Sequence, residues 1–156
     1  MSQRSRKLSR ILVAIDGSEA AMRAAEYAVS IPKKEDDGQL TALTVVELTK
    51  LGYTTFVTTP SPLSALKEVE KKRSEAKNWL EKAEEIAKQN SVPFRSEIIE
   101  EAILKVGSAI VRYAEQNYIE LIVIGTRGRS GFKKLLMGSV ASDVVSYAQC
   151  PVIVVK

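Results

Sequence analysis

The sequence predicts an α/β fold in which helices cover both faces of a parallel sheet. The run ILVAI at residues 11–15 is short and continuous, a pattern typical of a strand that is buried on both faces. Further strand-like segments follow along the chain, and segments with helical periodicity separate them. This alternation favours right-handed crossovers and a doubly wound sheet.

The first half of the chain contains two predicted strands and two predicted helices. After the run at 11–15, Ser18 can cap a helix over residues 19–30, and a second strand is predicted at 39–46. Residues 47–63 show no periodicity, which is typical of a lid or a disordered segment. A long helix is predicted over residues 64–89. The apolar stripe of this helix comprises Leu66, Val69, Ala76, Leu80, Ala83 and Ala87, and Trp79 beside it is interpreted as a packing residue.

The second half repeats the alternation. A third strand at 93–99 is rather polar, which indicates the edge of the sheet. A helix at 105–117, a strand at 119–124, a helix at 139–148 and a strand at 151–155 complete the pattern. The chain is therefore divided into a basic tail, residues 1–9, and a single domain, residues 10–156.

Composition excludes several classes of function. The 156 residues include no histidine, which rules out imidazole bases, histidine metal sites and Ser-His-Asp triads. The lone Cys150 excludes an internal disulfide and a multi-cysteine metal site. No apolar run approaches the roughly 18 residues of a membrane span, so a cytoplasmic protein without a membrane partner is expected. The net charge of +4 comes largely from the tail and from one loop, and this distribution does not favour nucleic-acid binding.

That loop lies within residues 121–140. A strand ends at Gly125, and a glycine-bearing segment with four cations and no carboxylate leads to a helix that begins near Ser139. Glycines allow main-chain N–H groups to approach a ligand, and a helix N-terminus offers unpaired donors and a partial positive charge. The order predicts an anion site, most often for phosphate, and an ordinary surface turn is the alternative.

Three segments together resemble a known family. The motifs G-x-x-x-x-G-K-[ST] and G-x-G-x-x-G are absent, but the chain carries G-x2-G-x9-G-S, starting at Gly125. With the ILVAIDGS start and the CPVIVV end, this pattern strongly resembles the universal stress protein family over residues 11–155. In that family the glycine motif marks the members that bind ATP. The G-x-P turn that often precedes the third helix is missing between residues 100 and 110.

The resemblance implies a Rossmann-like sheet of five parallel strands in the order 3-2-1-4-5. Strands 1 and 4 then flank the topological switch point, where open α/β sheets bind their ligands. Asp16 ends strand 1 and Gly125 ends strand 4, so both are expected at one crevice.

The resemblance also implies the roles of individual residues. Asp16 is expected at the ribose or at a phosphate-bound metal, although it is equally suited to starting a helix beside Ser18. The main chain of Val45 is expected at adenine, and Gly125 at the sugar, where a Cβ would crowd it. The implied nucleotide site consists of Ala14, Ile15, Asp16, Val45, Ile124, Gly125, Arg127, Gly128, Arg129, Gly138, Ser139 and Val140. Lys133 and Lys134 are interpreted as surface charges.

The favoured function is an ATP-binding regulatory or protective switch of the stress response, with at most slow ATP hydrolysis. Mg²⁺ or Mn²⁺ would bind through the phosphates. A homodimer is expected through the last strand, which comprises Val152, Ile153, Val154 and Val155. The alternative is a nucleotide-independent, dimeric, chaperone-like or scaffold protein of the same fold. An ATP-pyrophosphatase-type ligase would need an S-G-G-x-D-S loop after strand 1, which is absent.

Overall fold

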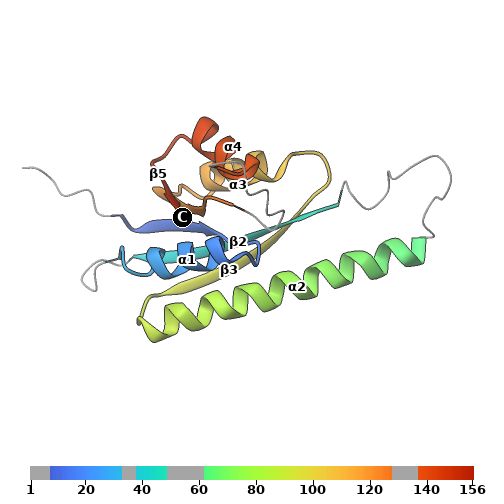
Figure 1. Cartoon of the computed structure of the whole chain (residues 1–156), viewed down its shortest axis with the longest axis horizontal. Helices are drawn as coiled ribbons and strands as arrows, with labels where there is room; N and C mark the ends of the chain where they lie inside the picture. Colours follow the sequence, from blue (N-terminus) through green and yellow to red (C-terminus); the bar gives the residue numbers. More distant parts are fainter. Residues whose placement is uncertain (1–7, 33–37, 49–61, 128–136) are drawn as a thin grey trace, which may run out of the picture.

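The computed structural model describes residues 8–32, 38–48, 62–127 and 137–156, within which strands and helices alternate (Figure 1). Each predicted boundary lies within two residues of the observed one. In chain order the elements are β1 (Arg10–Ala14), α1 (Glu19–Ala28), β2 (Gln39–Glu47), α2 (Pro62–Gln89), β3 (Phe94–Glu101), α3 (Val106–Gln116), β4 (Leu121–Gly125), α4 (Ser139–Tyr147) and β5 (Val152–Val155).

The sheet is parallel throughout and has the order β3-β2-β1-β4-β5, as expected, with β3 at one edge and β5 at the other. The pairing of β1 with β2 ends at Ala14 and Leu43, whereas the pairing of β2 with β3 continues to Glu47 and Glu101. Within the described parts of the chain, the last residues of β2 therefore extend beyond β1 and have a partner strand on one side only.

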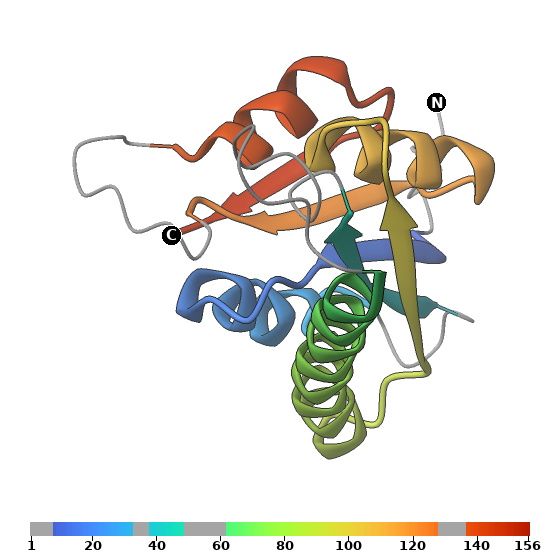
Figure 2. The same ribbon diagram turned by 90° about the vertical axis from the view of Figure 1, so that its right-hand side faces the viewer.

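The helices cover the two faces in pairs (Figure 2). Ile11 and Val13 of β1 pack with α1 and α2, and Leu12 packs with α3 and α4 on the opposite face. This alternation within one continuous apolar strand is what a sheet buried on both faces requires. Among the described helices, none combines the length and apolar character needed to cross a bilayer.

Small residues bring α1 very close to the sheet. A Cβ placed on Gly125 would lie 2.7 Å from the carbonyl carbon of Ala20 and 2.9 Å from its Cβ. The sequence-based reason for this glycine was crowding of a sugar. The structure provides a different reason, because a side chain at Gly125 would collide with the first turn of α1.

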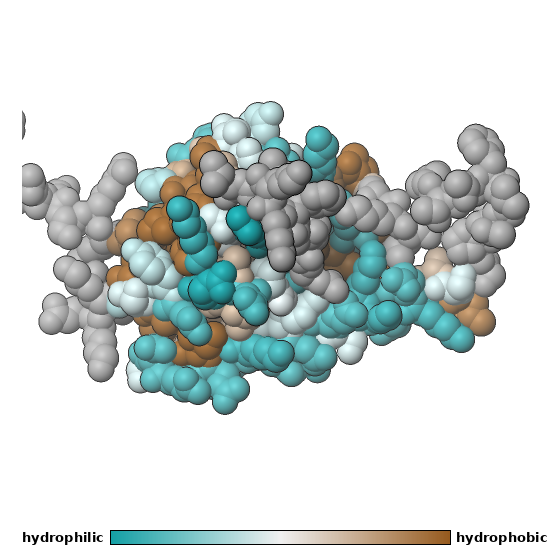
Figure 3. Space-filling model, viewed as in Figure 1, coloured by the Kyte–Doolittle hydropathy of each residue, from teal (hydrophilic) through white to brown (hydrophobic). Residues whose placement is uncertain are grey.

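The N-terminal part of α2 runs past the carboxyl ends of the strands (Figure 1). Ala76 and Leu80 are buried against the sheet, but Leu66 is 63% exposed. The prediction that Leu66 belongs to the buried stripe is wrong, since the sheet does not reach that turn of the helix. Most of the α2 surface visible in Figure 3 is hydrophilic, as predicted for its solvent side.

Glu101 organises the turn between β3 and α3, where the G-x-P turn is missing. Its buried carboxylate accepts the N–H groups of Ile103 at 2.9 Å and Leu104 at 3.0 Å, and it pairs with Arg112. The two N–H bonds, aided by the guanidinium, hold the pKa of this carboxyl below its ordinary value. A charged side chain thus replaces the proline in shaping the turn.

Candidate functional site

The segments that follow β1 and β4 meet at the carboxyl edge of the sheet. The two strands are neighbours with Val13 opposite Val123, and the Ser18 hydroxyl lies 3.2 Å from the carbonyl O of Arg127. The topological switch point is therefore bordered by both loops that the sequence singled out.

Asp16 has a structural role and also faces a cavity. Its Oδ1 accepts the N–H of Ser18 at 3.0 Å and the Ser18 hydroxyl at 2.6 Å, while the Ser18 Oγ accepts the N–H of Ala21 at 3.1 Å and caps α1. These bonds involve a single carboxylate oxygen, and the half-buried side chain also lines the cavity described next. The two interpretations of Asp16, a helix-start residue and a site residue, are thus compatible.

A cavity of about 330 Å³ lies between the end of β1, the end of β2 and α2. Its volume is at the lower end of the range of small-molecule sites. Its walls combine apolar surface with both signs of charge. The lining residues are Asp16, Thr44, Val45, Val46, Glu47, Glu68, Lys71, Lys72, Glu75 and Trp79.

The main chain of β2 directs its polar groups alternately toward β1 and β3. The N–H of Gln39 donates to the carbonyl of Ser9, on the β1 side, at 2.8 Å. The N–H of Leu40 donates to the carbonyl of Pro93, on the β3 side, at 2.9 Å. Odd-numbered residues of β2 therefore face β1, and Val45 is one of them.

Val45 lies beyond the point where β1 leaves β2. The β1–β2 ladder ends with the N–H of Ile15, which donates to the carbonyl of Leu43 at 2.8 Å. The carbonyl of Ile15 then accepts a hydrogen bond from the Thr44 hydroxyl at 2.9 Å. Among the described residues, no main-chain bond continues this ladder to Val45. Its N–H and C=O consequently lie side by side on an open strand edge in the cavity wall.

The N-terminus of α4 lies next to the end of β4. The N–H of Gly138 donates to the carbonyl of Thr126 at 2.6 Å, so it is already engaged and is not a spare donor. Within the described parts of the chain no side chain caps α4, in contrast to α1, and no acceptor is recorded there for the N–H groups of Ser139 and Val140 in its first turn. Gly138 belongs to the implied nucleotide site, but its N–H is not available to a ligand.

The other predicted site residues fall into three groups. Ala14 belongs to β1, Ile124 to β4 and Ile15 to the buried core, and none of the three lines the cavity. Arg127 is exposed at the start of its loop. Gly128, Arg129, Lys133 and Lys134 lie outside the described residues, as do the N-terminal residues 1–7 and most of the segment 47–63.

Sequence reasoning missed the contribution of α2 to the cavity. Glu68, Lys71, Lys72 and Glu75 line it, and Trp79, interpreted only as packing, does so as well. The spacing of three and four residues places these side chains on one helical face. Their charge suggested a solvated face, and only the overhang of α2 beyond the strands reveals the cavity beneath them.

Comparisons of the sequence and of the structure with known proteins agree on one family. Residues 7–156 match the model of the universal stress protein family. Universal stress protein MJ0531 of Methanocaldococcus jannaschii is 34% identical over 147 residues, which cover 94% of this chain and 81% of that protein. The structure of universal stress protein UspA from Lactobacillus plantarum superposes with a TM-score of 0.80 at 29% identity, covering 96% and 99% of the two chains.

A more distant structure of the same fold contains a ligand. The universal stress protein from Archaeoglobus fulgidus was solved in complex with dAMP. It is 22% identical to this chain, with a TM-score of 0.68, and the match covers 96% of this chain and 99% of that one.

Proposed function

This chain belongs to the universal stress protein family, and from that premise we propose that it binds an adenine nucleotide, ATP foremost, and acts as a regulatory switch in the stress response. The observation that carries the proposal is the open edge of β2 at Val45. Its adjacent N–H and C=O match the Watson–Crick edge of adenine, where N1 accepts and the 6-amino group donates. The A. fulgidus complex with dAMP supports the choice of base.

The remaining parts of a nucleotide have suitable surroundings. The second carboxylate oxygen of Asp16 would receive the ribose hydroxyls, or a Mg²⁺ or Mn²⁺ ion held by the phosphates. The phosphates would extend toward the uncapped N-terminus of α4, where Ser139 and Val140 offer main-chain N–H groups and Ser139 adds a hydroxyl. Gly128, Arg127 and Arg129 would complete the phosphate site from the loop.

The nucleotide proposal is tested first on the unmodified protein. We expect freshly purified, denatured protein to release adenine nucleotide on chromatography, and calorimetry with Mg²⁺ to show ATP binding. GTP is the matched control, because the guanine carbonyl places an acceptor against the C=O of Val45. Leaving polar groups unpaired costs about 1–3 kcal/mol, so GTP should bind about tenfold more weakly or worse. If no nucleotide is released and ATP does not raise the melting temperature, the nucleotide-independent interaction protein is favoured instead.

We also propose a homodimer through β5. This strand pairs with β4 on one side, and its four apolar residues are only half-buried. The carbonyls of Pro151 and Val155 bond toward β4, so the even-numbered Val152 and Val154 direct their polar groups to the open edge.

The dimer predicts a specific response to proline. Light scattering should give twice 17.1 kDa for the unmodified chain. Val154→Pro removes an N–H from the open edge alone and should give the monomer mass with the melting transition retained. Ile153→Pro is the matched control, since it removes an N–H from the β4 ladder and should destabilise the fold. A Val154→Pro variant that remains dimeric would place the interface elsewhere.

A further inference from the structure

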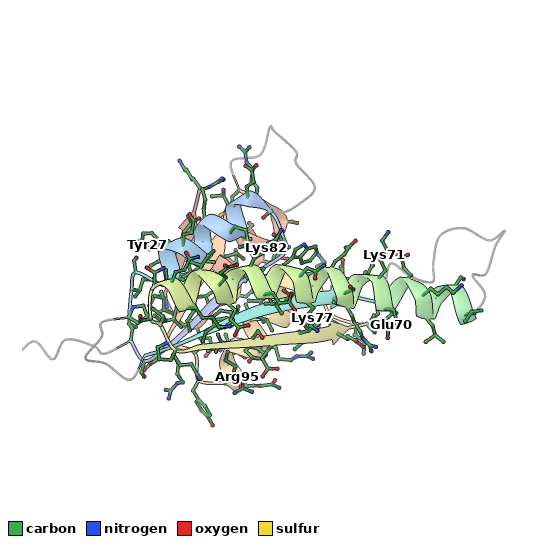
Figure 4. The ribbon with its side chains drawn as sticks, turned by 90° about the horizontal axis from the view of Figure 1, so that it is seen from below. Tyr27, Glu70, Lys71, Lys77, Lys82 and Arg95 are labelled. Carbon is green, nitrogen blue, oxygen red and sulfur yellow. The ribbon has the colours of Figure 1, made fainter. Side chains whose placement is uncertain are left out.

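One charged face of α2 overlooks the candidate nucleotide site. Lys71 and Lys72 lie between Glu68 and Glu75 along this face, and all four side chains line the cavity. Figure 4 shows Lys71 leaving α2 on the side of α1, whereas Glu70 leaves it on the side of β3. Lys71 and Glu70, although adjacent in the chain, therefore lie on different sides of α2.

Lys72 connects this face to the open edge of β2. Its Nζ lies 3.3 Å from the carbonyl O of Glu47, the last residue of the strand, and the contact is partly buried. Glu47 is odd-numbered, so its carbonyl points to the same side as the N–H and C=O of Val45, two residues earlier. The Lys72 ammonium thus donates a hydrogen bond to the edge of β2 that is no longer paired with β1.

This contact constrains a segment that, among the residues the structure describes, has a partner strand on one side only. Thr44 to Glu47 pair with β3, and the β1–β2 ladder has already ended at Leu43. A hydrogen bond from an ammonium is stronger than a neutral one, and partial burial protects it from competition by water. Lys71 is exposed and has no corresponding bond to β2 among the described contacts, although it belongs to the same wall.

We propose that Lys72 is a positioning residue of the nucleotide site: by holding the carbonyl of Glu47 it fixes the end of β2 and keeps the N–H and C=O of Val45 directed into the cavity. The inference rests on the proposed adenine site, because Val45 is the base-binding group. Lys72 acts through β2 and does not touch the phosphates, so its effect is independent of their number.

The test compares Lys72→Met with Lys82→Met, at an exposed lysine of α2 that does not line this cavity, as the control and Lys72→Arg as the conservative variant. Calorimetry with AMP, ADP and ATP should show each nucleotide bound about three- to tenfold more weakly by Lys72→Met, by the same factor for all three. This loss is smaller than that of a whole charge-assisted bond, because Lys72 acts on the base only through β2. Lys82→Met should bind nearly as the unmodified protein does, and Lys72→Arg should restore most of the affinity. The melting temperature should change little, because the ladder to β3 remains.

Amide hydrogen exchange reports on β2 directly. The N–H groups of Val46 and Leu48 face β3, with Leu48 bonded to the carbonyl of Glu101 at 2.8 Å. Their exchange should accelerate in Lys72→Met, whereas that of Leu40 at the other end of β2 should not change.

Three results would overturn the inference: unchanged affinities, a loss that grows from AMP to ATP, which would indicate direct phosphate contact, or unchanged exchange at Val46 and Leu48. An unmodified protein that binds none of the three nucleotides would refute the proposed function instead. Amide hydrogen exchange at Val46 and Leu48 would still show whether Lys72 stabilises the end of β2.

Discussion

Val45→Pro is expected to bind ATP at least about tenfold more weakly than the unmodified protein while keeping its fold. Proline lacks the N–H group, and at Val45 that group faces the cavity, so the substitution removes the proposed donor to adenine N1 and leaves the β3 ladder intact. The acceptor on the base would be left without a partner, which costs about 1–3 kcal/mol; a cost of about 1.4 kcal/mol or more is tenfold or more in affinity. Calorimetry measures this loss, and circular dichroism checks the fold.

Two controls separate the main chain from the side chain. Val45→Ile keeps the N–H group and enlarges only the side chain, so its ATP affinity should change little. Val46→Pro removes the N–H group that faces β3 and should lower the melting temperature, because it breaks a ladder bond. Normal ATP binding by Val45→Pro would refute the assignment of Val45 as the base-binding residue.

The sequence was sufficient to predict the positions that depend on local chemistry. The DGS segment indicated a helix start, and the structure shows Asp16 and Ser18 bonded to each other in that role. The apolar runs and their alternation with helices were sufficient for the element order, and the resemblance supplied the strand order.

Features that depend on where elements end relative to one another could not be predicted. Nothing in the residues around Val45 reveals that the pairing of β1 with β2 ends at Leu43. The main chain of Val45 is accessible because that pairing ends there. The contribution of Lys72 was hidden for the same reason, since the overhang of α2 is set by the lengths of the strands beneath it. The contact of Gly125 with Ala20 of α1 could not be predicted either, because it depends on how closely α1 packs on the sheet.

Gly17→Ala is expected to have the largest effect on stability. Gly17 has a φ of +78°, and a Cβ there would lie 2.4 Å from Cε2 and Nε1 of the Trp79 indole. The left-handed conformation costs about 1–2 kcal/mol for a residue with a Cβ. Forcing a large ring to move in a packed region adds about 1–3 kcal/mol. For a domain of this size the sum corresponds to a melting temperature lower by about 10 °C.

A double-mutant cycle distinguishes the two causes. Trp79→Ala is destabilising by itself because it removes packing against the α1/α2 face of the core, but it also vacates the space that a Cβ at Gly17 needs. In the Trp79→Ala background, Gly17→Ala should cost only the conformational part, so the two substitutions should be less than additive. Strict additivity in denaturant unfolding would show that the indole does not press on Gly17. Since Gly17 follows Asp16 directly, the displaced turn should also weaken ATP binding, and the same double variant should recover part of that affinity.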